Sequence, residues 1–206
     1  VTKTTTACFE PSLDYCVTKI PRWDLGKFEG VSQVIGTSMK SVGEVMAIGR
    51  NFEEAIQKAV RMVNPALDGL GGQVEDGMPL DDQLSTPTDT RLFAVQAAFE
   101  AKYSVDRVHD LTKIDRWFLS KLHNIATLRD EASHLSLGQL TKPVLVKMKR
   151  AGFSDKQLAT AINAASLSWC RARAELLRDR LAVAPPRTAI IAAQLQVGVR
   201  RQRRNR

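Results

Sequence analysis

Two short segments near the start of the chain show the alternation of apolar and polar residues that is typical of β-strands. The first covers residues 13–20 (LDYCVTKI) and ends at Pro21. The second covers residues 42–48 (VGEVMAI) and is bounded by Gly49. Glycine weakens a strand interior, so Gly43 predicts a bulge or a point of close backbone approach. The pattern therefore predicts two strands.

Helical spacing replaces this alternation directly after the second strand. Asn51 is a favourable N-cap, and Glu54 three residues later is its expected capping-box partner. Residues 52–63 then repeat apolar side chains on one helical face. Two strands and one helix are too few to complete a sheet. Residues 1–63 are therefore expected to be poorly stable alone, because sheet edges and an apolar helix face lack partners.

The chain then changes character twice. Residues 64–88 contain seven Pro and Gly residues and five acidic residues, which predicts a linker and a domain boundary. From residue 89 onward the apolar spacing is helical and no strand pattern occurs. The predicted helices cover residues 89–102, 105–111, 114–133, 140–150 and 155–163, and a last helix capped by Ser166 runs to about residue 181.

Helix boundary signals support this division. Ser104 and Ser154 are placed as N-caps, and Gly152 follows the helix over 140–150 as a favourable C′ residue. Pro185 and Pro186 stop the last helix. The predicted fold class is mostly α, with a small α/β segment followed by an all-α domain of short helices.

The formal net charge of +8 in 206 residues raises the question of a nucleic-acid or membrane partner. Residues 1–170 contain equal numbers of basic and acidic residues, so the whole excess lies in residues 171–206, which use Arg and no Lys. The neutral body gives no support for a basic binding face. The segment over 199–206 (VRRQRRNR) is either a nucleic-acid or targeting tail or an unselected, mis-framed C-terminus, and the sudden loss of Lys and acids favours the second.

Residues for catalysis or metal binding are sparse. Cys8, Cys16 and Cys170 have no metal-site spacing, and their odd number fits a reducing compartment. His109, His123 and His134 have no shared motif, and no glycine-rich phosphate loop precedes a helix. Neither a signal peptide nor a membrane-spanning apolar run is present in the sequence, so no membrane partner is expected.

Two segments allow a functional and a structural interpretation. Period-2 alternation places Lys40 and Glu44 on one side of the second strand, where they either face a phosphate or metal site or form an ion pair at the strand edge. Residues 152–180 have helix–turn–helix proportions with several Arg residues on the second helix. They predict either a DNA-reading helix or two packed helices with Arg on the solvated face. In both segments the structural interpretation is favoured.

Several longer strings resemble the large, ATP-consuming chain of carbamoyl phosphate synthetase. They are residues 9–15 (FEPSLDY), 17–23 (VTKIPRW), 39–50 (MKSVGEVMAIGR), 52–55 (FEEA) and 57–59 (QKA). In the helical part the strings are residues 111–119 (LTKIDRWFL) and 152–157 (GFSDKQ). The resemblance covers roughly residues 7–181.

The resemblance implies a domain organisation. It places residues 1–63 at the C-terminal end of an ATP-grasp domain that forms carboxyphosphate, and residues 64–88 in a linker. Residues 89–181 are similar to the helical oligomerisation domain, and residues 182–206 form a divergent Arg-rich tail that lacks the family's continuation. On this view the chain is a fragment that mainly mediates domain packing and oligomerisation. The alternative is a free-standing helical adaptor or helix–turn–helix DNA-binding module.

The family's metal and nucleotide ligands have no matching position in this chain, so the resemblance implies no catalytic, cofactor-binding or metal-ligating residue, and the chain alone is expected to be inactive. Lys40, Glu44 and Arg50 remain candidates for a place near the ATP-grasp site. The parent enzyme uses ATP and Mg²⁺ or Mn²⁺ to make carbamoyl phosphate from bicarbonate and glutamine-derived ammonia, in pyrimidine, arginine or urea pathways. Implied partners are the other ATP-grasp domains, a glutaminase subunit or domain and further copies of the chain, without specific nucleic acid. The expected location is cytoplasmic, with mitochondrial as the alternative.

Overall fold

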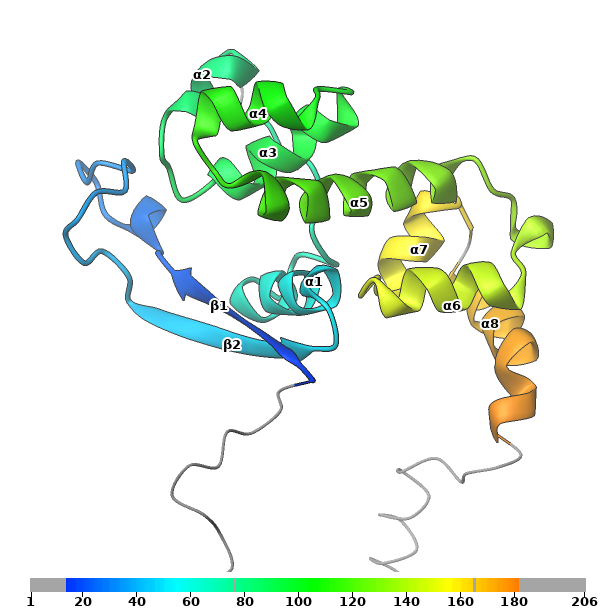
Figure 1. The fold of residues 1–206 in the computed structure, drawn as a ribbon. Helices are drawn as coiled ribbons and strands as arrows, with labels where there is room; N and C mark the ends of the chain where they lie inside the picture. Colours follow the sequence, from blue (N-terminus) through cyan, green and yellow to red (C-terminus); the bar gives the residue numbers. More distant parts are fainter. Residues whose placement is uncertain (1–13, 76, 165, 182–206) are drawn as a thin grey trace, which may run out of the picture.

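The computed structural model describes residues 14–75, 77–164 and 166–181 (Figure 1). Within them, a two-stranded antiparallel ribbon is formed by β1 (Cys16–Arg22) and β2 (Gly43–Gly49), with Cys16 opposite Gly49 and Arg22 opposite Gly43. Helix α1 (Phe52–Val63) lies along one face of this ribbon. The inward side chains of the strands are half-buried or buried, whereas the outward ones are exposed.

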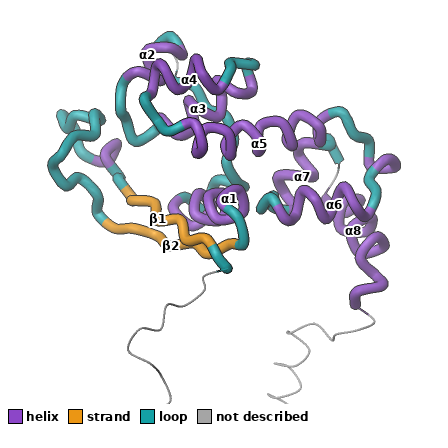
Figure 2. Tube along the Cα trace, in the orientation of Figure 1, coloured by secondary structure: helices purple, strands orange, loops and turns teal. Residues whose placement is uncertain are grey.

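The remaining helices form two groups joined by a long one (Figures 1 and 2). Helix α5 (Arg116–Ser133) runs from the first group to the second. The first group contains α2 (Leu80–Ser85), α3 (Arg91–Glu100) and α4 (Val105–Thr112). The second contains α6 (Lys142–Arg150), α7 (Asp155–Ala161) and α8 (Ser166–Leu181). The fold is mostly α with a small α/β segment, as predicted.

One cluster of buried apolar side chains connects α1 to both helix groups. Ile56 and Val60 of α1 belong to the same core as Val95 of α3, Ile125 of α5 and Phe153 before α7. Because this core crosses from α1 into the helical part, α1 has hydrophobic partners on its helical side as well as on the ribbon.

Residues 64–88, predicted as a linker, contain an element that the pattern did not indicate. Helix α2 has only six residues, too few to show helical periodicity, and it lies among turn-forming residues. Leu70 and Leu84 are fully buried in the core. The Gln83 side chain bonds the backbone of Glu75 and Met78, which fixes this segment against the helices. Much of the segment is therefore packed rather than extended in solvent.

The predicted special role of Gly43 is wrong. Gly43 pairs in regular register with Arg22, and no described atom lies within 4 Å of the position that a Cβ would take. The close approach occurs at Gly49 instead, where a Cβ would lie 2.9 Å from the Ala55 backbone nitrogen. Pro21 also does not end β1, which continues to Arg22.

The predicted caps are largely confirmed. The Asn51 side chain accepts from the Glu54 amide at 2.8 Å, but the Glu54 carboxylate accepts from the Arg50 amide rather than completing a box with Asn51. Ser104 caps α4, and Ser154 forms a full capping box with Gln157 at α7. In the described part of the chain after residue 88, only helices and turns follow, as the pattern predicts.

Candidate functional site

Helix α1 is joined to the corner between α6 and α7 by donors that satisfy the end of α6. The Gln57 amide donates to the Ala151 carbonyl at 2.7 Å, and the Arg61 guanidinium donates to the Gly152 carbonyl at 2.9 Å. The Asn51 amide donates to the Arg150 carbonyl at 3.2 Å. These carbonyls belong to the last residue of α6 and to the two residues after it, where the helix offers no further donor, so α1 supplies the donors. We call this contact the α1–α6 junction.

Close approach of the two backbones at this junction depends on a glycine. Gly152 has a φ of 88°, in the left-handed region, and a Cβ there would lie 2.7 Å from the Glu54 Cα. Any other residue would be strained by the left-handed backbone, and its Cβ would collide with Glu54. The GFSD string that begins at Gly152 is therefore a packing requirement of the junction as well as a helix-boundary signal.

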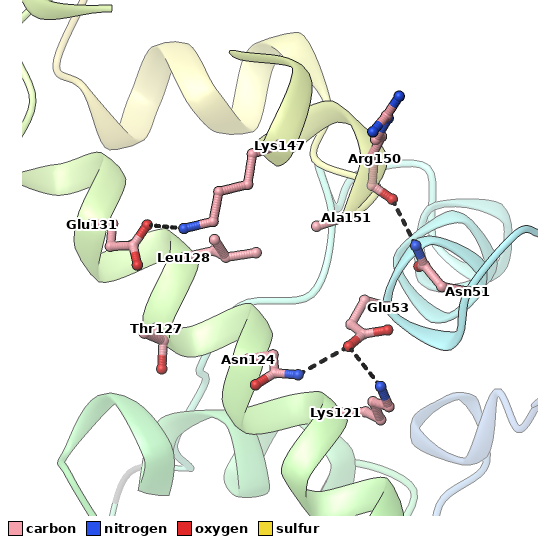
Figure 3. Close-up of a pocket in the computed structure, with 10 residues that line it drawn as sticks. All are labelled: Asn51, Glu53, Lys121, Asn124, Thr127, Leu128, Glu131, Lys147, Arg150 and Ala151. Carbon is pink, nitrogen blue, oxygen red and sulfur yellow. Dashed lines mark hydrogen bonds and ion pairs between the residues drawn. The ribbon is translucent and has the colours of Figure 1, made fainter. Parts of the chain in front are cut away.

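A pocket of about 470 Å³ lies beside the junction, between α1, α5 and α6 (Figure 3). The Glu53 carboxylate accepts from the Asn124 amide at 3.1 Å and lies 3.6 Å from the Lys121 ammonium. On the opposite wall, Lys147 and Glu131 form an ion pair at 2.7 Å. The charges that line the pocket are thus largely committed to one another, and the arrangement has no nucleophile beside a base.

An aromatic cluster lies next to this pocket at the start of α5. The Phe52 ring of α1 meets Trp117 and Phe118 edge to face, at centroid distances of 5.7 and 5.5 Å, and Trp117 and Phe118 are 5.0 Å apart. The Lys121 ammonium lies 5.5 Å from the Trp117 ring centroid. Trp117 is 53% exposed and Phe118 45% exposed. We call Phe52, Trp117 and Phe118 the aromatic patch.

Local helix geometry explains why the patch faces outward. Asp115 caps α5 by accepting from the Trp117 amide at 2.8 Å, which fixes where the helix begins. Leu119 and Leu122, three residues apart on one helical face, are buried in the core. Trp117 and Phe118 therefore lie on other faces of the same turn. No site was predicted at Trp117 and Phe118, although the helical spacing of Leu119 and Leu122 was the available signal for their position off the buried face.

The three near-site candidates do not come together. The Lys40 ammonium donates to the carbonyls of Ser32 and Val34 at 2.9 and 2.7 Å, which ties down the loop between the strands. Glu44 forms its ion pair with Lys19 of β1 at 2.7 Å, so the expected Lys40–Glu44 pair is wrong. The Arg50 amide donates to Glu54 at 2.9 Å.

These contacts have an electrostatic consequence at Glu54. Partial burial raises the pKa of Glu54, but the hydrogen bonds from the Arg50 amide and Lys58 lower it, and the net pKa lies below the ordinary value. Lys58 also donates to the Ile48 carbonyl at 3.1 Å, which connects α1 to the end of β2. Glu54 is thus a structural anion at the start of α1.

Each of the three histidines contacts a neighbouring group of the chain. The His109 ring bonds the Ile114 carbonyl at 2.7 Å, His123 packs edge to face on Phe99, and His134 lies 3.8 Å from Asp130. Among the described residues, no group of three His, Cys, Asp or Glu side chains could hold a metal ion. The same part of the chain contains no helix long and apolar enough to cross a membrane.

Arg173 and Trp169 of the α7–α8 hairpin make contacts within the chain. Asp155 accepts from Arg173 at 2.7 Å and from the indole of Trp169 at 3.4 Å, and it lies 3.3 Å from Lys149. Trp169 is fully buried. Arg173 therefore holds the hairpin together, which agrees with packed helices rather than with a DNA-reading helix. The side chains of Arg178 and Arg180 and the tail over 199–206 lie outside the described residues.

Comparison with known families gives this geometry a context. A family model described as "Carbamoyl-phosphate synthetase large chain, oligomerisation domain" matches residues 44–177. The chain belongs to this family. In the carbamoyl-phosphate synthetase match, the range begins inside β2 and therefore includes α1, the junction and the aromatic patch.

Curated relatives agree with the carbamoyl-phosphate synthetase assignment. The chain is 54% identical over 187 residues to the mitochondrial arginine-specific carbamoyl phosphate synthase large chain of Schizosaccharomyces pombe, covering 90% of this chain and 16% of the relative. It is 53% identical over 176 residues to the multifunctional protein CAD of Squalus acanthias, covering 85% of this chain and 8% of the relative. The chain thus spans less than a fifth of the length of these relatives.

Proposed function

We propose that this chain supplies an assembly segment of a carbamoyl phosphate synthetase large chain, which binds further copies and the adjoining parts of the enzyme. The aromatic patch is the observation that supports this most directly. Half-exposed Trp and Phe side chains are costly on a free surface and are typical anchors of protein interfaces. The patch also lies within the range that matches an oligomerisation domain.

The construction of the patch fits this role. Phe52 comes from α1, whereas Trp117 and Phe118 come from α5, so the shape of the patch depends on how these helices are held. The α1–α6 junction and the Glu53–Asn124 bond hold them. A preformed aromatic surface loses little conformational entropy on binding, which favours association.

We further propose how the chain is divided. Residues 1–63 would correspond to the end of the carboxyphosphate-forming ATP-grasp domain, residues 64–88 to the connection, and residues 89–181 to the helical oligomerisation domain. Residues 182–206 would form a divergent tail, which lies outside the described residues. Helix α1 would belong to both units, since it packs on the ribbon and on the helical core.

We also propose the activity of the whole enzyme to which this chain belongs. The parent protein would use ATP, bicarbonate and glutamine-derived ammonia, with Mg²⁺ or Mn²⁺, to make carbamoyl phosphate for arginine or pyrimidine synthesis. A glutaminase subunit or domain would be a further partner. The cytoplasm is the proposed location, and the mitochondrion is the alternative supported by the names of two relatives. No catalytic step is assigned to residues of this chain.

Sedimentation velocity over a range of concentrations tests the assembly role. The 206-residue chain should self-associate. The double variant Trp117→Ser/Phe118→Ser should raise the dissociation constant of this self-association at least about 10-fold, as expected when interface anchors are removed. Met39→Ser is the matched control, because Met39 is an exposed apolar residue in the loop between the strands. Unchanged association of the double variant, or an equal loss in the control, would contradict the proposal.

A further inference from the structure

A second, larger cavity lies away from the aromatic patch. It has a volume of about 640 Å³, within the usual range for small-molecule sites, and is formed by the end of β1, the end of α1 and the start of α3. Its apolar wall includes Ile20, Val60, Leu67, Leu92, Phe93 and Ile114. Basic and acidic side chains also reach it, so the cavity combines an apolar wall with fixed charges.

Arg91 is the unpaired cation of this cavity. Its side chain is half-buried at the first position of α3 and makes no hydrogen bond or ion pair with any described residue. Burial lowers the pKa of Arg91, which shows that the surroundings do not offset the loss of water around the guanidinium. An Arg in such a position lacks the planar acceptor that its donors would bind.

The other charges of the cavity do not supply this acceptor. Asp24 accepts from Arg22 at 3.1 Å and from Lys27 at 2.9 Å, and these bonds lower the pKa of Asp24. Asp89 also lines the cavity, its Oδ1 is buried without a hydrogen-bond partner, and no ion pair between the described residues joins it to Arg91. With Arg22, Lys27 and Arg91 against Asp24 and Asp89, the lining carries one surplus positive charge. A ligand with a single negative charge would balance it, whereas a dianion would also be repelled by the two carboxylates.

The N-terminus of α3 lies on the same side of the cavity. The hydroxyl of Thr90, the N-cap residue, donates to Glu75 at 2.7 Å, so α3 has no side-chain cap. The Arg91 and Phe93 amides donate to the carbonyls of Thr88 and Thr90, so this end contributes mainly its helix dipole, which favours a negative group nearby. This effect strengthens an anion site at Arg91 but would not define one by itself.

The rim of the cavity is held in place by the loop between the strands. The Ile35 amide donates to the Pro87 carbonyl at 2.7 Å, and Val34 forms an isolated bridge with Thr88. Lys40 fixes the same loop through the carbonyls of Ser32 and Val34. The segment that leads into Arg91 is therefore braced, which is what a preformed binding site requires.

We propose that this cavity binds a small organic monocarboxylate, with its carboxylate on the Arg91 guanidinium and its apolar body against Leu92, Phe93 and Ile114. The planar guanidinium matches a carboxylate in a two-bond geometry. The single surplus charge selects a monoanion over a phosphate, and the apolar wall selects a ligand with a short hydrocarbon body.

An NMR titration of the 206-residue chain with 4-methylpentanoate tests this site. Amide signals of residues 88–93 should shift in a saturable manner, whereas the neutral isostere 4-methylpentanamide and inorganic phosphate should bind at least about 10-fold more weakly, because each lacks part of the match. Equal binding of the acid and the amide would overturn the proposal. Tighter binding of phosphate would overturn the choice of a monocarboxylate.

Variants separate a specific site from general charge. Arg91→Gln should weaken binding at least about 10-fold. Arg91→Lys should have an intermediate affinity, since it keeps the positive charge but loses the paired donors of the guanidinium. Arg116→Gln is the matched control, because Arg116 is exposed and paired with Asp106 outside the cavity. Val63→Phe should weaken binding by narrowing the cavity while leaving Arg91 in place. Full binding by Arg91→Gln, or no saturable shift in the wild type, would leave the cavity as a packing site for another protein segment and overturn the proposal.

Discussion

Helix α1 has two sides that are built differently. Towards α6 it is held by buried side-chain donors and by a glycine that lets two backbones approach closely. Towards the ribbon it covers one face of two strands, whose outer face exposes Val17, Met46 and Ile48. The junction is therefore closed within this chain, whereas the ribbon presents an apolar face that nothing described covers. Helix α1 therefore packs on both parts of the chain, with its most extensive contacts on the strands.

The strongest way to break this contrast is to add a side chain at the junction. Gly152→Val should destabilise the chain by about 3–5 kcal/mol, combining a left-handed backbone cost with overpacking against Glu54. Urea unfolding followed by far-UV circular dichroism measures the change. Gly43→Val in the ribbon is the matched control, because Gly43 has open space and a negative φ, and it should change stability by less than about 1 kcal/mol.

Hydrogen exchange compares the same two sides without a disruptive substitution. The free energy of opening for amide exchange should be about 1–2 kcal/mol lower in β1 and β2 than in α1. A two-stranded ribbon with one uncovered face has only marginal stability. The paired changes Val17→Thr and Ile48→Thr on the outer face should leave global stability within about 0.5 kcal/mol, as exposed positions usually do. Equal protection of β1, β2 and α1 would show that the ribbon is as firmly closed as the junction.

The sequence predicts most secondary-structure elements but not the contacts between them. Alternation and helical spacing predicted both strands, α1 and the helices from α3 to α8, since each follows local patterns of burial. Local pattern could not place Gly49, rather than Gly43, at the close approach, because that depends on where α1 turns back. It could not find α2, which is one short turn-flanked helix.

The candidate site was harder to predict than the fold. In an extended strand, Lys40 and Glu44 would lie on the same side. In the structure Lys40 precedes β2, and its ammonium donates to loop carbonyls instead. Gln57 and Arg61 read as the polar side of α1, yet they bond carbonyls more than 90 residues away. Contacts of this kind depend on tertiary arrangement and have no signature at neighbouring positions.

The smallest expected effect concerns the charge at the start of α1, between the two sides. The folded-state pKa of Glu54 is below its ordinary value, because the bonds from the Arg50 amide and Lys58 outweigh the opposing effect of burial. A lowered pKa stabilises the fold above the unfolded value of 4.5, and this stability is lost as the pH falls through the folded-state pKa. Glu54→Gln should therefore cost about 0.5 kcal/mol at neutral pH and flatten the dependence of stability on pH below 4.5.

Urea unfolding at a series of pH values measures this change in stability. Glu29→Gln is the control, because exposed Glu29 contacts no described residue through a hydrogen bond or ion pair. A variant that keeps the full acid dependence would show that Glu54 does not link the strand end to α1, and the two sides would then be independent.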